Sequence, residues 1–208
     1  AMRLAVFLAA LLLTFAPMPH AVADDRADCE ARNDKSIAAC TRIIKKGPET
    51  AGMADTYYRR GMRYRDNEEY DKAIQDFTKA LRLKPGWSWP LIARGHAYSW
   101  SKRHTEAIAD QELAVKLDPS DVAYSARGMD LMAAGELDRA LADFNKSIEL
   151  NPKRFYAYLN RGHLYMKRSK HREALSDYRM ALEIGSPYQA ENQECRDGIK
   201  KAKKELGE

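Results

Sequence analysis

Apolar residues recur at spacings of three and four along most of the chain, which places them on one face of successive helices. The pattern is clearest in four segments, each of which predicts one amphipathic helix. These segments are residues 70–83, 104–117, 137–150 and 171–184. A proline follows each of them, at positions 85, 119, 152 and 187. Proline ends a helix because it lacks an N–H donor and restricts the residue before it.

A period near 34 residues organises the helices. Glycines recur at steps of 34, 33 and 34 residues, and a set of alanines recurs with the same steps. The glycines are Gly61, Gly95, Gly128 and Gly162, and the alanines are Ala73, Ala107, Ala140 and Ala174. Every glycine lies 12 residues before its alanine, so the single deletion falls between the second and third units. This period predicts stacked helical hairpins. Because glycine is unfavourable inside a helix, its recurrence there predicts a neighbouring helix that packs too closely to leave room for a side chain.

Seven positions of the repeat carry characteristic residues in a fixed order. The first unit has an aromatic, Gly, Tyr, Ala, aromatic, Ala and Pro at Tyr57, Gly61, Tyr64, Ala73, Phe77, Ala80 and Pro85. The fourth unit repeats the order at Tyr158, Gly162, Tyr165, Ala174, Tyr178 and Ala181. Over residues 54–187 this pattern resembles the tetratricopeptide repeat (TPR) family. The units depart from the family pattern at Gln111, Leu131, Ser147 and Ser186.

The resemblance implies an all-α fold, a right-handed α-solenoid of about four helical hairpins with a concave groove that binds peptides or protein segments. The four repeats are expected at residues 54–87, 88–120, 121–154 and 155–187. Residues 24–53 align with a degenerate leading half-repeat whose first helix is cut short. Residues 188–208 have few large apolar side chains and are expected to form a C-terminal capping helix, because the end of a solenoid must face water.

Residues 1–23 have the composition of a secretory signal peptide. Arg3 precedes an uninterrupted apolar run from Leu4 to Ala16, and Ala21-Val22-Ala23 supplies small residues before a cleavage site. The run is shorter than the roughly 20 apolar residues of a membrane span. We therefore expect the segment to be removed and the mature chain to have no stable membrane span. The expected location is the periplasm, with secretion as the alternative.

Export determines how the three cysteines are interpreted. Cys29 and Cys40 are close in sequence, and an oxidising compartment favours a disulfide between them. Such a bond would add on the order of 3 kcal/mol to the leading repeat. Cys195 is the odd cysteine and is expected to be free or bonded to another molecule.

Charged residues of both signs are mixed along the chain, with 35 Lys and Arg, 30 Asp and Glu, and a formal net charge of +5. Each unit has an arginine directly before its glycine and an aspartate three residues after its alanine. The arginines are Arg60, Arg94, Arg127 and Arg161, and the aspartates are Asp76, Asp110, Asp143 and Asp177. This recurrence predicts Arg–Asp bridges between helices, within one unit or between neighbouring units. The alternative is a ladder of arginines that binds an anion. The remaining positive charge is too small to indicate a nucleic-acid partner.

Four positions of each first helix face the concave groove by analogy with the family. The partner-binding residues expected there are Tyr58, Met62, Arg65, Trp89, Ile92, His96, Trp100, Met129, Met132, Tyr156, Leu159, His163 and Met166. A groove rich in methionine and aromatic residues suits hydrophobic peptide segments, because thioethers adapt to varied shapes. The alternative is that some of these side chains pack against the solenoid itself. Chaperone-binding members of the family have a carboxylate clamp of Lys and Asn, where this chain has Tyr58 and Met62.

Catalytic motifs are absent from the sequence, which has no P-loop, G-x-S-x-G, H-E-x-x-H or G-x-G. His96 and His163 share one repeat position near several methionines, a set that could hold copper(I). Without a spacing motif we expect no metal and no other cofactor. The sequence thus predicts a non-enzymatic scaffold or adaptor of the cell envelope that binds a protein or peptide in its groove. The alternative is an accessory subunit of an envelope complex that uses its convex face or termini, and homo-oligomerisation stays open.

Overall fold

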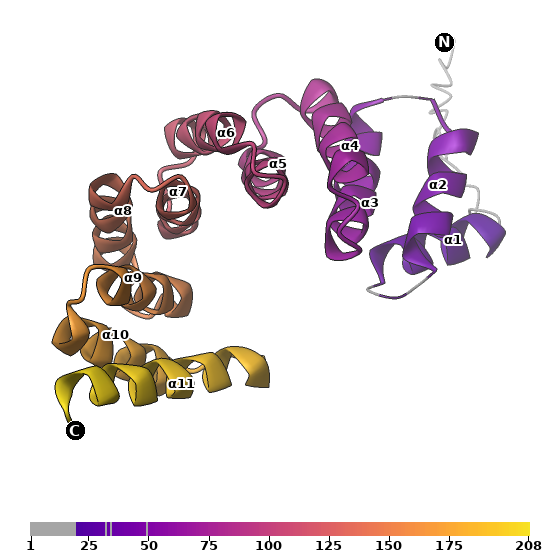
Figure 1. The fold of residues 1–208 in the computed structure, drawn as a ribbon. Coiled ribbons are helices and arrows are strands. Elements are labelled where there is room, and N and C mark those ends of the chain that lie inside the picture. Colours follow the sequence, from indigo (N-terminus) through magenta and orange to yellow (C-terminus); the bar gives the residue numbers. More distant parts are fainter. Residues whose placement is uncertain (1–19, 32, 34, 49) are drawn as a thin grey trace, which may run out of the picture.

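The computed structural model describes residues 20–31, 33, 35–48 and 50–208, and the side chains of residues 20–24 are outside this description. Within these ranges the chain consists of α-helices and one short 3-10 turn, with no strand. The helices pack in successive pairs, and the pairs follow one another around a crescent (Figure 1). The predicted all-α solenoid is confirmed.

Four hairpins form the body of the crescent. Their helices are α3 (Ala54–Asp66) with α4 (Tyr70–Leu83), α5 (Ser88–Trp100) with α6 (His104–Leu117), α7 (Asp121–Ala133) with α8 (Leu137–Leu150), and α9 (Phe155–Lys167) with α10 (His171–Ile184). The second helix of each pair has the bounds that the apolar pattern predicts. Residues 118–120 join α6 to α7, whereas the longer links 84–87 and 151–154 join the neighbouring hairpins. The deletion in the repeat therefore lies in that link, as the sequence predicts.

In three of the four hairpins the glycine of the first helix lies against an aromatic ring of the second helix. A Cβ atom on Gly61 would lie 2.8 Å from the ring of Phe77, and one on Gly162 would lie 2.8 Å from the ring of Tyr178. Gly128 has the same relation to Phe144. These distances are too short for a side chain, so the predicted close packing is confirmed. The contact lets these three hairpins close tightly over a buried ring.

The repeated arginines and aspartates form bridges within each hairpin. Arg60 donates from Nε to Asp76 at 2.7 Å and from Nη2 to the other carboxylate oxygen at 2.8 Å. The same two-point geometry joins Arg94 to Asp110, Arg127 to Asp143 and Arg161 to Asp177. In three of the four, Nη1 also donates to the preceding hairpin, at Thr41, Thr78 or Asn145. The arginines therefore hold helices together, and the structure does not support the anion ladder.

The leading repeat has two helices, α1 (His20–Glu30) and α2 (Ser36–Lys46), followed by the 3-10 turn η1 (Ala51–Met53). The predicted disulfide between Cys29 and Cys40 is confirmed and joins α1 to α2. Asp25 on α1 also accepts a hydrogen bond of 2.6 Å from Arg42 on α2. Helix α1 is shorter than the first helices of the four hairpins, and it begins within the segment that the sequence assigns to the signal peptide.

Most of that predicted signal peptide, residues 1–19, lies outside the described residues. Among the helices that the structure describes, none is long and apolar enough to cross a membrane.

Helix α11 (Gln189–Leu206) packs against α10 at the end of the crescent. A Cβ atom on Gly198 would lie 2.7 Å from Tyr178, so this ring is enclosed between Gly162 and Gly198. Helix α11 therefore has the place of the first helix of a further hairpin, and Gly198 continues the glycine series that the sequence analysis ended at Gly162. Cys195 on α11 is fully buried and forms no disulfide with the described residues, and burial raises the pKa of its thiol to about 11.

Candidate functional site

The first helices of the hairpins line the inner curve of the crescent (Figure 1). A cavity of about 260 Å³, the central cavity, lies between α3, α5, α7 and the start of α9. It brings together eight of the residues predicted for the groove: Tyr58, Met62, Arg65, Trp89, Ile92, His96, Met129 and Tyr156. Residues that are three or four apart on one helix share a face, so each first helix contributes a row of side chains.

Aromatic side chains are unusually exposed on this surface. Trp89 is 47% exposed and Trp100 is 52% exposed. Trp100 does not line the central cavity, but its ring lies 6.0 Å from that of His96, and the guanidinium of Arg65 lies 5.8 Å from its centre. Trp87, which the sequence analysis did not assign to the site, lies in the link before α5 with its ring 4.9 Å from that of Tyr58.

The remaining predicted residues lie elsewhere. Leu159 is only 4% exposed and belongs to a core cluster with Tyr178 and Cys195, so it packs against the solenoid. Met132 packs against a core cluster of the third hairpin. His163 and Met166 line a separate cavity of about 620 Å³ between α9, α10 and α11, the C-terminal cavity. The thirteen predicted residues therefore do not form one continuous site.

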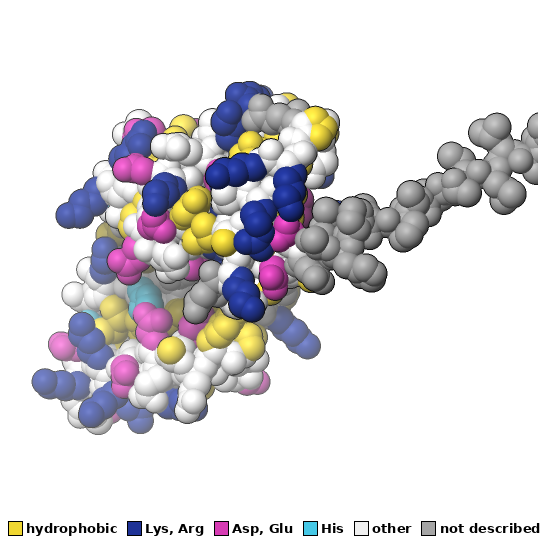
Figure 2. Space-filling model, turned by 90° about the vertical axis from the view of Figure 1, so that its right-hand side faces the viewer, with side chains coloured by type: hydrophobic (Ala, Val, Ile, Leu, Met, Phe, Trp, Pro, Cys, Tyr) yellow, Lys and Arg dark blue, Asp and Glu magenta, His cyan; other side chains and the backbone are white. Residues whose placement is uncertain are grey.

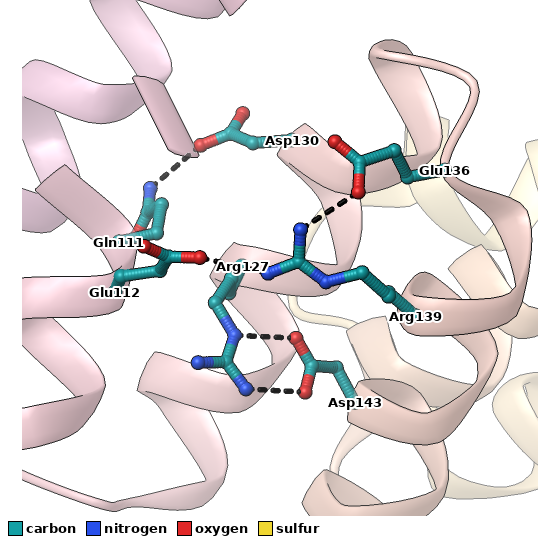
Figure 3. A network of polar contacts seen from close by, with 7 residues as sticks. All are labelled: Gln111, Glu112, Arg127, Asp130, Glu136, Arg139 and Asp143. Atoms are coloured by element: carbon teal, nitrogen blue, oxygen red, sulfur yellow. Dashed lines mark hydrogen bonds and ion pairs between the residues drawn. The ribbon is translucent and has the colours of Figure 1, made fainter. Parts of the chain in front are cut away.

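A buried polar cluster lies beneath the central cavity, between the second and third hairpins. The Gln111 amide donates a 2.7 Å hydrogen bond to Asp130 and a 3.3 Å bond to the backbone oxygen of Ile92. Both side chains are buried, and Figure 3 shows them facing each other across the boundary between α6 and α7. Burial raises the pKa of Asp130, although the nearby His96 opposes this shift. Burial also lowers the pKa of His96, which Asp130 opposes.

The sequence carried a partial signal for this cluster. Gln111 departs from the family pattern at a position where the other units have Phe77, Phe144 or Tyr178, and Gly95 faces its amide in place of a ring. Asp130 carried no such signal, because no repeat of polar residues accompanies it.

Arg154 is a second residue that the sequence analysis missed. It lies in the link before α9, lines the central cavity, and donates from Nε to Asp121 at 2.7 Å. Asp121 also accepts a 2.9 Å hydrogen bond from Asn151, and these two donors hold its pKa below the ordinary value against the opposing effect of burial. The repeat pattern gave no signal for Arg154, because the link residues vary between units.

Figure 2 views the molecule from the side on which the crescent opens. Lysine and arginine side chains lie on both the upper and the lower parts, and hydrophobic and histidine side chains lie between them. Within the part of the chain that the structure describes, no group of three or more His, Cys, Asp or Glu side chains is placed to hold a metal ion. The chemistry that this surface offers is apolar contact, aromatic stacking and hydrogen bonding from guanidinium groups.

Stacked helical hairpins, each with a glycine of the first helix packed against the second helix, define the class of α-solenoid repeat proteins. Family models agree: Tetratricopeptide repeat models match residues 54–86, 91–121 and 155–185, and a TPR repeat model matches residues 128–169. The chain therefore belongs to the tetratricopeptide repeat family.

Solved structures share the fold. The crystal structure of the APC/C hetero-tetramer Cut9-Hcn1 superposes with a TM-score of 0.75 at 18% identity, over 90% of this chain and 36% of that chain. The first TPR of Spaghetti (RPAP3) bound to the HSP90 peptide SRMEEVD has a TM-score of 0.53 at 29% identity, over 59% of this chain and 99% of that chain.

Curated relatives match over part of their length. Heat shock protein STI1 of Saccharomyces cerevisiae is 32% identical over 100 residues, which are 47% of this chain and 17% of that protein. The chain spans less than a third of the length of several such relatives: the matched regions are 15%, 8% and 30% of three of these proteins. Proteins with these repeats act as scaffolds that bind other proteins or peptides, and they are generally non-catalytic.

Proposed function

We propose that this protein is a non-enzymatic scaffold that binds a segment of a partner protein in its concave groove, centred on the central cavity. The observation that carries the proposal is the cavity itself, which is lined by apolar and aromatic side chains from four successive hairpins. In the described part of the chain no segment fills it. A related repeat domain binds a peptide, which supports this use of the fold.

The aromatic residues would supply most of the binding energy. Trp89 stands half exposed on α5, a rigid helix, so it loses little conformational freedom when a partner covers it. Buried aromatic anchors of this kind contribute on the order of 2 kcal/mol or more each. Met62 and Met129 line the same cavity, and their flexible thioethers would adapt to the shape of the guest.

The partner would not be recognised through the carboxylate clamp of chaperone-binding relatives. Tyr58 and Met62 occupy the positions where the clamp requires Lys and Asn, and both line the central cavity. An apolar guest side chain suits these residues better than a charged one.

We also propose that the protein acts in the cell envelope after export, with secretion as the alternative. The apolar run Leu4–Ala16 and the small residues Ala21-Val22-Ala23 support a cleaved signal peptide. The Cys29–Cys40 disulfide supports an oxidising compartment. Cell fractionation and amino-terminal sequencing test this proposal, and the mature chain should begin at Asp24. A full-length protein found with the cytoplasmic fraction would contradict it.

The groove is tested by removing side chains from it. Trp89→Ala and Met129→Ala should abolish recovery of the partner from an envelope extract, as measured by mass spectrometry after affinity capture. Met180→Ala is the matched control, because Met180 is 39% exposed but lies on α10, outside the central cavity. Circular dichroism should show the same helical content in all variants. If only substitutions on the convex face abolish recovery, the accessory-subunit alternative is correct.

A further inference from the structure

The charged side chains that line the central cavity are all positive. Arg65 on α3 and Arg154 before α9 belong to the lining, which includes no Asp or Glu. His96 also lines the cavity, and because burial lowers its pKa it is neutral at pH 7. An apolar surface with two guanidinium groups in its lining attracts apolar groups and carboxylates together.

Both guanidinium groups can accept a further partner. Arg65 donates to Asp66 at 2.8 Å, but Asp66 is 39% exposed, and an exposed pair of this kind is weakly held. Arg154 engages Asp121 through Nε. A guanidinium has five N–H donors in a planar fork, so one carboxylate does not satisfy it.

The C-terminal cavity is lined by charges of both signs. Glu194, Asp197 and Glu205 line the C-terminal cavity together with Lys167 and Lys201. Glu194 lies 3.5 Å from the imidazole of His163. A guest carboxylate would meet carboxylates as well as ammonium groups there, whereas the central cavity presents guanidinium groups alone, so it is the better site for a carboxylate.

Resting on the proposed groove binding, we propose that the guest is an acidic peptide segment. It places an apolar or aromatic side chain in the central cavity and a carboxylate against Arg65 and Arg154. The carboxylate is that of an Asp or Glu side chain or the carboxyl terminus of the guest, since a guanidinium binds both in the same two-point geometry. The apolar contact supplies affinity, and the charge pair selects acidic segments over neutral ones.

Fluorescently labelled eight-residue peptides test this inference with the full chain by fluorescence anisotropy. One peptide has a central Asp-Phe-Asp-Leu sequence and a blocked carboxyl terminus, and its neutral counterpart has Asn-Phe-Asn-Leu. A third peptide is neutral but ends in Phe-Leu with a free carboxylate. The acidic peptide, or the one with the free carboxylate, should bind at least about tenfold more tightly than the blocked neutral peptide at low salt. This preference should shrink as salt rises.

Arg65→Gln should remove most of the preference for the acidic peptide over the blocked neutral peptide, measured as the ratio of the two affinities. Arg63→Gln is the matched control. Arg63 lies on the same helix as Arg65, contacts the same Asp66 at 2.9 Å, and its side chain is 17% exposed against 19% for Arg65. Unlike Arg65, it does not line the central cavity. Equal losses in the two variants would mean that net charge alone attracts the peptide, which would overturn the inference.

Equal affinity of all three peptides would also overturn it and would leave groove binding intact. The proposed groove binding fails separately if Met129→Ala, a cavity substitution that changes no charge, leaves the binding of every peptide unchanged.

Discussion

The side-chain amide of Gln111 donates a 2.7 Å hydrogen bond to the buried carboxylate of Asp130, 19 residues further along the chain. This bond joins the second hairpin to the third. The other junctions use an arginine that donates to the preceding hairpin, as Arg94 does to Thr78. At the Gln111 junction the accompanying surface contact is a 2.7 Å ion pair between Glu112 and Arg139 (Figure 3). One boundary in the solenoid is therefore held by different chemistry from the rest.

Removing the donor should destabilise the protein. Gln111→Leu should lower the free energy of unfolding by about 1–3 kcal/mol, because the buried carboxylate of Asp130 would lose one of its donors. The double variant Gln111→Leu/Asp130→Leu should recover part of this loss, since removing both partners of a buried polar contact is nearly neutral. Urea denaturation measures the changes. Glu112→Ala is the control and should cost less than about 0.5 kcal/mol, because its ion pair is half exposed. If the loss in the double variant equals the sum of the losses in the two single variants, Gln111 and Asp130 are not coupled.

The same cluster predicts two opposite effects of pH on stability. Burial raises the pKa of Asp130. Its contribution to the free energy of unfolding is therefore fully present below about pH 4 and is lost as the pH rises through the pKa of the folded state. Burial lowers the pKa of His96. Its contribution to the free energy of unfolding is therefore present above about pH 6.5 and is lost as the pH falls through the pKa of the folded state. Relative to the wild type, Asp130→Asn should therefore gain stability as the pH rises from 4, and His96→Asn should gain it as the pH falls from 6.5. Urea denaturation across pH 4–8 measures both, and slopes of the same sign would contradict the prediction.

The enclosed ring of Tyr178 should make its two glycines intolerant of a methyl group. Gly162→Ala and Gly198→Ala should each lower the free energy of unfolding by about 1–2 kcal/mol, since the cost of overpacking exceeds the roughly 1 kcal/mol gained in helix propensity. Thermal denaturation measures the loss. Gly86→Ala is the control, because a Cβ atom there would meet nothing within 4 Å, and it should change stability by less than about 0.5 kcal/mol.

The turn within each hairpin offers a stabilising substitution. Lys102 has a φ of 62° where the third hairpin has Gly135 with a φ of 85°, and only glycine adopts this region without cost. Lys102→Gly should raise the free energy of unfolding by about 0.5–1 kcal/mol despite the greater freedom of the unfolded chain. Ala134→Gly, at a φ of −75°, should lower it. A loss in both variants would mean that the backbone at residue 102 is not strained.

The disulfide should act only on the leading hairpin. Replacing Cys29 and Cys40 with Ala should destabilise α1 and α2 by about 3 kcal/mol, because the bond closes a short loop between them. Hydrogen exchange followed by mass spectrometry should show loss of protection in residues 20–46 and little change from α5 onward, since each unit of a solenoid contacts only its neighbours. Loss of protection throughout the chain would contradict this local role.

The repeats, the bounds of α4, α6, α8 and α10, the close approach at the glycines and the Cys29–Cys40 pair follow from the sequence alone. These features depend on local periodicity and on short separations, and the fixed period repeats the signal four times. The exceptions are the ends of the array. Helix α1 shows no clear apolar face, and the step from Gly162 to Gly198 is 36 residues, so neither end matched the period.

Only the tertiary structure decided which groove residues share a site. Helix α11 covers the fourth hairpin, so Leu159 becomes part of the core with Cys195 while Trp89 stays half exposed. The curvature of the crescent brings Arg154 from a link to the same cavity as Arg65. The bond from Gln111 to Asp130 occurs once and has no equivalent in the other repeats. A repeat pattern reports what successive units have in common, whereas the groove and the buried cluster depend on how particular units differ and on the angle at which they stack.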